Sequence, residues 1–136
     1  MNAPTDPLSA IRAINESAAF NRWCGIEVAK AGAGEAEIVM PWRGEVGQYA
    51  GFLHAGLIGA LIDTACGFAA FPVAGPVAAS HCAVRFLAPA AGTAFVATAR
   101  VQKAGRRQVF VTAELHADGR LVAAGDTILV PIAAQT

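Results

Sequence analysis

The residues of this chain that could do chemistry lie in one apolar stretch, QYAGFLHAGLIGALIDTACGFAAF, residues 48–71. Its one charged residue is Asp63, and Gln48 and His54 precede it. A buried carboxylate without partners is strongly unfavourable. We therefore expect Asp63 either to turn outward at the helix surface, or to bond a strand N–H, or to point into a cleft. In a cleft it would take part in chemistry.

The start of the same stretch offers hydrogen-bond donors. A helix beginning near His54 leaves the backbone N–H groups of Ala55 and Gly56 without partners inside the helix. These groups carry the positive end of the helix dipole, which suits a carbonyl oxygen that is becoming an oxyanion. The side-chain amide of Gln48 adds a possible donor.

The acid and the donors cannot meet within one chain. Asp63 follows Ala55 by eight residues, which on a helix is about 12 Å along the axis and about 80° round it. It can reach the start of a second copy's helix if two such helices lie antiparallel. The sequence therefore predicts a dimer with two composite sites, each taking the acid from one chain and the donors from the other.

The remaining elements follow from periodicity and turn signals. Asp6 as N-cap and Pro7 predict a short amphipathic helix to about Asn21. A loop over residues 43–51 leads to the apolar helix, roughly 54–71, which FPVAGP should end after Phe71. Alternation and turn residues predict six strands, two before this helix, within 25–42, and four after it, within 79–89, 92–105, 107–119 and 120–132. We expect an α+β fold in which one antiparallel sheet wraps the apolar helix on most sides.

Composition limits the classes of function. The 136 residues show no abrupt change, so we predict a single domain over 1–136, with 1–22 as an N-terminal helical extension. Apolar residues make up 55% and charged ones 15%, with a net charge of zero. Neutrality argues against nucleic-acid binding. The scarcity of charge favours burial of surface between copies, as a homodimer or homotetramer.

Three cysteines, Cys24, Cys66 and Cys82, are widely spaced and fit no metal-ligand pattern. They indicate a reducing, cytoplasmic environment, and the N-terminal segment lacks the pattern of a secretory signal. A membrane helix over residues 50–79 is the competing interpretation of the apolar run. The central Asp63, the Gly and Ala content and the Pro-containing break argue against it.

The stretch GFLHAGLIGALIDTACGFAA, followed by VRFLAPA, resembles the hotdog-fold thioesterases of the phenylacetyl-CoA and 4-hydroxybenzoyl-CoA type. Their motif is a Gly, two residues, His-Gly-Gly and then a helical Asp or Glu. The resemblance implies a hotdog fold, dimers that often pair into tetramers, and hydrolysis of a small aryl- or medium-chain acyl-CoA. It implies no metal or redox cofactor, because coenzyme A is part of the substrate.

The resemblance also assigns roles. Asp63 matches the acid that attacks the thioester or activates a water, and Ala55 matches the glycine whose N–H polarises the carbonyl. Gln48 matches an assisting Asn or Gln, and His54 matches the histidine that shapes the loop. The chain has Ala55 where glycine is commoner. Many members also carry a Ser or Thr early in the next strand; Ala79 occupies that place here, with Ser80 one residue on.

Further residues are candidates for substrate binding. Gly56 and Phe52 lie beside the helix start. Either the strand begins irregularly and Ser80 helps to position water, or this helper is missing. Arg85 and Arg106, the latter in the basic turn KAGRR, could meet the phosphates of coenzyme A, although turn charges are usually only solvated. Four aromatic residues could line an acyl pocket or simply pack in the core: Tyr49, Phe52, Phe68 and Phe71.

Two other classes of function share this architecture. A hotdog hydratase or dehydratase would use a His–carboxylate pair, which His54 and Asp63 could form only across chains. A non-catalytic acyl-CoA-binding module would bind without releasing thiol. The sequence does not identify the acyl group.

Overall fold

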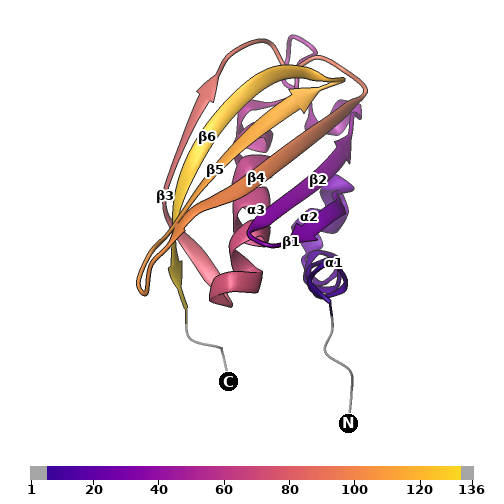
Figure 1. Cartoon of the computed structure of the whole chain (residues 1–136). Coiled ribbons are helices and arrows are strands. Elements are labelled where there is room, and N and C mark those ends of the chain that lie inside the picture. Colours follow the sequence, from indigo (N-terminus) through magenta and orange to yellow (C-terminus); the bar gives the residue numbers. More distant parts are fainter. Residues whose placement is uncertain (1–5, 133–136) are drawn as a thin grey trace.

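The structure, a computed structural model, describes residues 6–132 as two short helices, a long helix and six strands. Figure 1 shows their arrangement. In chain order the elements are α1 (Pro7–Ser17), α2 (Ala19–Cys24), β1 (Glu27–Gly32), β2 (Glu35–Pro41), the 3₁₀ turn η1 (Gly44–Val46), α3 (Ala55–Ala74), β3 (Val77–Phe86), β4 (Ala94–Ala104), β5 (Val109–Ala117) and β6 (Arg120–Pro131).

The N-terminal helix begins as predicted but is divided in two. Asp6 caps it, since its Oδ1 accepts a hydrogen bond from the Ser9 N–H at 2.9 Å, and Pro7 occupies the first turn. The expected single helix to about Asn21 is wrong, because Ala18 is extended (φ −91°, ψ 116°) and separates α1 from α2. The Ser17 hydroxyl donates to the Ile14 carbonyl at 2.6 Å. Such local bonding competes with helix continuation.

The six strands form one antiparallel sheet in the order β1-β2-β4-β5-β6-β3, which confirms the predicted α+β architecture. Asp118 and Gly119 connect β5 to β6 with φ of 48° and 83°, the left-handed pair that the Asp-Gly signal predicts for a tight hairpin. The register of β3 against β6 shifts between Ala79 and His81, so Ser80 is the extra residue of a bulge.

α3 is the central helix, and it is longer than predicted. It runs through Pro72 and ends at Gly75, whose φ of 73° only glycine adopts freely. The predicted end after Phe71 is therefore wrong by about one turn. Pro72 removes only its own N–H bond, to the Phe68 carbonyl, and the helix closes behind it with the Gly75 N–H bonded to the Phe71 carbonyl at 2.8 Å.

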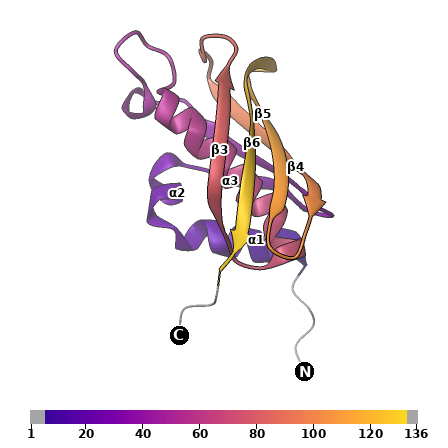
Figure 2. The same ribbon diagram turned by 90° about the vertical axis from the view of Figure 1, so that its left-hand side faces the viewer.

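One face of α3 packs on the sheet while another stays open. Eight residues of the helix are buried: Ile58, Leu61, Ile62, Ala65, Cys66, Phe68, Ala69 and Ala70. A second stripe of small residues is exposed or half-buried: Ala55, Gly56, Gly59, Ala60, Asp63, Thr64 and Gly67. The six strands of the curved sheet all contact α3, as expected of a sheet wrapped around a central helix, while this stripe stays open and α1 and α2 lie beside the helix (Figure 2).

α3 is also long and apolar enough to cross a membrane, the one such helix within residues 6–132. Its apolar face nevertheless packs against the strands. The fold is that of a soluble domain in which α3 is the core helix.

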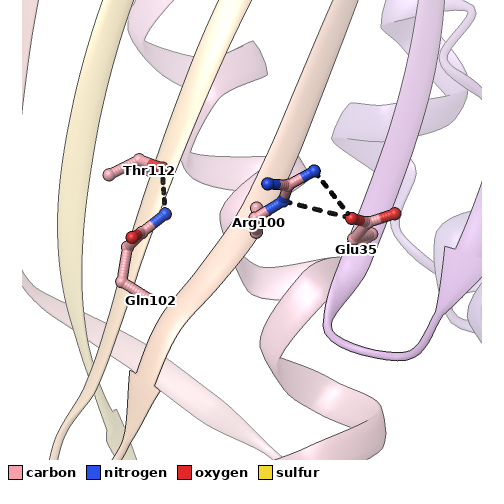
Figure 3. A network of polar contacts seen from close by, with 4 residues as sticks. All are labelled: Glu35, Arg100, Gln102 and Thr112. Carbon is pink, nitrogen blue, oxygen red and sulfur yellow. Dashed lines mark hydrogen bonds and ion pairs between the residues drawn. The ribbon is translucent and has the colours of Figure 1, made fainter.

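The opposite face of the sheet is polar. Arg100 donates to Glu35 across β4 and β2, with Nε and Nη2 both 3.1 Å from Oε1 (Figure 3). The Gln102 amide donates to the Thr112 hydroxyl at 3.0 Å. A shallow hollow of about 490 Å³ lies over these paired groups. It is on the far side of the sheet from α3 and contains neither Asp63 nor Ala55.

Candidate active site

Asp63 lies on the open stripe of α3, where its side chain is exposed and borders a groove of about 340 Å³. No hydrogen bond or ion pair within residues 6–132 engages its carboxylate. Desolvation by the surrounding elements raises the pKa of Asp63 above its usual range. The sequence left open whether Asp63 turns outward at the helix surface or points into a cleft. Both apply, because the side chain turns away from the core and borders the groove.

The groove extends from Asp63 toward the C-terminal end of α3. Its walls come from three parts of the chain that are distant in sequence: the N-terminal helices, α3, and the start of β3. It is lined mainly by apolar and small residues, namely Ile14, Ala18, Asn21, Asp63, Thr64, Gly67, Phe68, Phe71, Pro76, Val77, Ala78, Ala79 and Leu129. Among these, Asp63 is the one ionisable residue. An elongated apolar group can therefore lie along the groove with one end beside the acid.

The N-terminal end of α3 has a single uncommitted donor. His54 is the N-cap, and its Nδ1 accepts a hydrogen bond from the Gly56 N–H at 2.8 Å. The N–H groups of Leu57 and Ile58 bond the His54 carbonyl at 2.9 and 3.1 Å. The Ala55 N–H takes part in no hydrogen bond of the described part of the chain. Of the two expected donors, Gly56 is thus engaged by the cap and Ala55 is free.

His54 also explains why a glycine follows two residues later. A Cβ on Gly56 would lie 3.0 Å from the His54 Nδ1 and 3.2 Å from its Cε1. This is tighter than ordinary van der Waals contact, so a side chain at Gly56 would push the capping ring away. The histidine and the small residue after Ala55 are therefore one structural unit that defines the start of the helix.

Gln48 has its amide oriented by its own loop. The Oε1 atom accepts hydrogen bonds from the Ala50 N–H and, at 3.5 Å, from the Phe52 N–H. An amide held by its oxygen directs its nitrogen the other way, so Nε2 is available as a donor. Gly47 and Leu53 form an isolated bridge that closes this loop just before α3.

The structure thus gathers some predicted residues and separates others. Gln48, Phe52, His54 and Ala55 lie at the N-terminal end of α3, next to Gly56. Asp63 lies about 12 Å further along the same helix, so the acid and the donors do not meet within one chain.

The other three predicted residues lie elsewhere. Ser80 sits in the β3 bulge, and its hydroxyl donates to the Ile128 carbonyl at 3.2 Å, while Ala79 next to it lines the groove. Arg85 faces the outer side of the sheet, and Arg106 is exposed in the β4–β5 turn. Neither arginine borders the groove.

Comparison with known proteins identifies the family. The profile of the thioesterase superfamily matches residues 50–124, which include Ala55, Asp63 and most of the sheet. The chain belongs to the thioesterase superfamily. No curated protein matches its sequence significantly.

Solved structures of this superfamily and of related proteins share the fold. A thioesterase family protein from Silicibacter pomeroyi is 31% identical, with a TM-score of 0.89 over 94% of this chain and 100% of that chain. A mutant of the phenylacetic acid degradation protein PaaI from Thermus thermophilus is 25% identical, with a TM-score of 0.78 over 83% of this chain and 98% of that one. The PaaI protein of E. coli, 24% identical with a TM-score of 0.85 over 94% of this chain and 98% of its own, shows the same fold. The resemblance to hotdog thioesterases is confirmed.

The sequence analysis did not predict that the N-terminal helices α1 and α2 form one wall of the groove. Asn15 donates from Nδ2 to the Ile26 carbonyl at 2.8 Å, and Asn21 donates from Nδ2 to the Asn15 Oδ1 at 2.9 Å. Both asparagines are buried, and this relay fixes α1 and α2 against the chain entering β1. Two buried asparagines in an amphipathic helical segment were the available signal, because buried amides need partners.

None of the three cysteines lines the groove. Cys66 is buried one turn after Asp63, and burial raises the pKa of its thiol to about 12. Desolvation likewise raises the pKa of Cys82 and of Cys24. The thiolate is the reactive form, so Asp63 remains the groove's candidate for attack or proton abstraction.

Proposed function

We propose that this chain hydrolyses acyl-CoA thioesters to a free acid and coenzyme A, at sites shared between two subunits. Asp63 of one subunit attacks the thioester carbonyl or takes a proton from the attacking water. The Ala55 N–H and the Gln48 amide of the other subunit polarise the carbonyl oxygen. The observation that supports this most is that α3 has one free N–H at its start and one free carboxylate on its open stripe.

The chemistry follows from those two groups. As the carbon–oxygen double bond opens, negative charge develops on the oxygen, and donors placed there in advance stabilise it. Collapse of the tetrahedral intermediate breaks the carbon–sulfur bond, and coenzyme A leaves as a thiol after taking a proton. If Asp63 attacks directly, the resulting anhydride is opened by water; if Asp63 acts as a base, water forms the acid in one addition.

The free edge of the sheet supports pairing of two copies. At the β1 edge, side chains of α1 already occupy edge carbonyls, since Arg12 Nε donates to the Val28 carbonyl at 3.1 Å and Asn15 to that of Ile26. The β3 edge is ten residues long, and all residues from Ala78 to Cys82 are exposed. A long exposed edge is a template for another strand, and on β3 the bulge at Ser80 interrupts this edge at one point. We therefore assign β3 as the pairing strand of a homodimer.

The groove limits the acyl group to moderate size. Its volume of about 340 Å³ and its apolar lining suit a small aryl or medium-chain acyl group. Two of the matched proteins are named for phenylacetic acid degradation, which is consistent with an aryl acyl group. The coenzyme A portion would lie outside the groove, where Arg85 and Arg106 remain candidates for its phosphates.

Release of free thiol from a panel of acyl-CoAs tests the reaction. We expect aryl- or medium-chain acyl-CoAs to be hydrolysed by the wild-type chain and Asp63→Asn to lose most turnover while it still binds the same thioester. Full turnover by Asp63→Asn would remove Asp63 from the mechanism. Binding by the wild type without any thiol release would favour an acyl-CoA-binding module instead.

Mixed dimers test whether the site is shared. Asp63→Asn removes the acid, and Ala55→Pro removes the donor N–H. If each site takes one group from each chain, a mixed dimer of the two inactive variants has one intact site and one site lacking both groups. Co-refolding equal amounts should then restore about a quarter of the wild-type activity, because about half of the dimers are mixed. No recovery, with mixed dimers present, would mean that both groups act within one chain.

A further inference from the structure

Tyr49, the sole tyrosine of the chain, is fully exposed at 102% relative exposure. A single exposed ring is common on protein surfaces. The surroundings of Tyr49 are less common, because its turn is held from both sides. The Gly51 N–H bonds the Gln48 carbonyl at 3.0 Å, and the Gln48 N–H bonds the Phe52 carbonyl at 2.8 Å. The Gln48 side chain also holds the Ala50 N–H. The ring is therefore presented on an ordered turn.

The loop that carries Tyr49 projects beyond the N-terminal end of α3 (Figure 2). In the proposed dimer the two α3 helices lie antiparallel, with the Ala55 of one opposite the partner subunit's Asp63. Any segment that projects past the start of one helix then lies over the C-terminal half of the other. That half carries the groove, from Asp63 to Phe71.

The lengths are compatible. Phe71 follows Asp63 by eight residues, or about 12 Å along the helix. Tyr49 precedes Ala55 by six residues, a segment that would span about 20 Å if fully extended and spans less in the turn described above. The floor of the groove has room for a ring at Gly67, where an added Cβ would meet nothing within 4 Å.

We propose that the Tyr49 ring of one subunit closes the acyl groove of the other and thereby sets the length of acyl group that is bound. The inference rests on the proposed function, because it requires the antiparallel pairing of α3. The ring would pack over the Gly67–Phe71 part of the groove, against Phe68 and Phe71, and cover an acyl chain from solvent. An acetyl group ends close to Asp63 and does not reach the ring, whereas a medium-chain or aryl group does.

Two variants separate the ring from the rest of the loop. Tyr49→Ala removes the ring, and Tyr49→Phe keeps it as a matched control. We expect Tyr49→Ala to lower kcat/KM for octanoyl-CoA about tenfold, mostly by raising KM. The apolar surface of the acyl chain that the ring removes from water stabilises the complex by about that factor in affinity. The value for acetyl-CoA should change less than about twofold, and Tyr49→Phe should resemble the wild type. An unchanged octanoyl-CoA value, or equal losses for both substrates, would overturn the proposal.

Mixed dimers show which subunit supplies the ring. In a dimer of Tyr49→Ala and Asp63→Asn chains, the site with an intact Asp63 belongs to the Tyr49→Ala chain. If the ring comes from the partner, this site has its ring, and the mixed dimer shows the wild-type KM for octanoyl-CoA. The raised KM of Tyr49→Ala would instead show that the ring acts within its own chain and would refute the proposal.

A third measurement does not depend on hydrolysis. N-acetylimidazole also acetylates thiols and amines, so the reaction is followed through O-acetyltyrosine, which hydroxylamine reverses. Because Tyr49 is the sole tyrosine, this product reports on its ring alone. We expect the assembled protein to react several-fold more slowly than urea-unfolded chain, and more slowly again with octanoyl-CoA bound to Asp63→Asn. Reaction at the unfolded rate in both states would overturn the proposal. Absence of hydrolysis for every acyl-CoA would instead remove the proposed function, and the acetylation rates would still decide the place of the ring.

Discussion

Replacing Ala55 by proline should remove one backbone donor and little else. Ala55 is the first residue of α3, a position where proline is favoured because its missing N–H has no helical partner. His54 before it has φ −61° and ψ 137°, the extended conformation that a residue preceding proline adopts. The His54–Gly56 cap involves other atoms and should persist.

The expected effect on catalysis is large and that on stability is small. Loss of one oxyanion donor lowers turnover by about 10²–10³, or about 2.7–4 kcal/mol of transition-state stabilisation. A proline at a compatible position changes the free energy of unfolding by about 1 kcal/mol or less, and usually stabilises. We therefore expect kcat to fall about 100-fold or more, which corresponds to a loss of about 2.7 kcal/mol or more of transition-state stabilisation. The melting temperature Tm should move by only a few degrees.

The assay is thiol release from the best acyl-CoA of the panel, with Tm measured on the same samples. Ala55→Gly is the matched control, because it also alters the side chain but retains the N–H, and it should keep kcat within a few-fold. Wild-type turnover by Ala55→Pro would show that this N–H does not stabilise the oxyanion. Equal losses in both variants would assign the effect to the helix start as a whole.

Substitutions at three other positions test the candidate site and the elements that support it. The pKa of Asp63 is higher in the folded chain than in the unfolded chain, so ionisation of Asp63 lowers the stability of the fold as pH rises through that pKa. Asp63→Asn should therefore raise Tm at pH 7, and this gain should vanish below pH about 4, where the wild-type carboxyl is protonated in both states. The wild-type rate should fall on acidification at a higher pH than for an ordinary aspartate. His54→Ala should cost about 1 kcal/mol in urea unfolding through loss of the cap, and His54→Asn, which can still accept from the backbone, should retain most of it. Gly125→Ala should destabilise by about 1–3 kcal/mol in the same assay, because its Cβ would lie 2.6 Å from the Ala83 carbonyl and 3.2 Å from Ile62; an unchanged midpoint would mean that β3 and α3 move aside freely.

Features governed by local rules could be predicted from the sequence. Alternation of apolar residues placed all six strands, and the Asp118–Gly119 pair placed the β5–β6 turn. Asp6 and Pro7 placed the start of α1. Each of these depends on residues within a few positions of one another, so no tertiary contact was needed to interpret them.

Features that depend on competition between local backbone preferences and packing between distant elements were predicted less well. Pro72 was expected to end α3, but packing of the helix on the sheet compensates for one lost hydrogen bond, and Gly75 ends the helix instead. The break at Ala18 was not expected, because the apolar spacing continues across it. The division of α3 into a packed face and an open stripe depends on how far the sheet curves, which the pattern of one helix does not reveal.

The same distinction applies to the candidate site. Spacing alone indicated that Asp63 and Ala55 are about 12 Å apart on one helix. That the two groups act together across chains stays a prediction. The sequence did not reveal that His54 occupies the Gly56 N–H and so leaves Ala55 as the one free donor. Nor did it reveal the wall made by α1 and α2, since residues far apart in the chain meet there.

The unequal edges of the sheet limit how large an assembly can grow through strand pairing. Because α1 covers β1, a β3 strand that pairs with another chain can only meet that chain's β3. Such a contact uses the same surface on both partners and leaves no unpaired strand behind, so the sheet becomes continuous across two chains and stops there. In the proposed dimer, a short amphipathic helix near the N-terminus would thus limit strand pairing to two chains, whereas two free edges could propagate into a fibre.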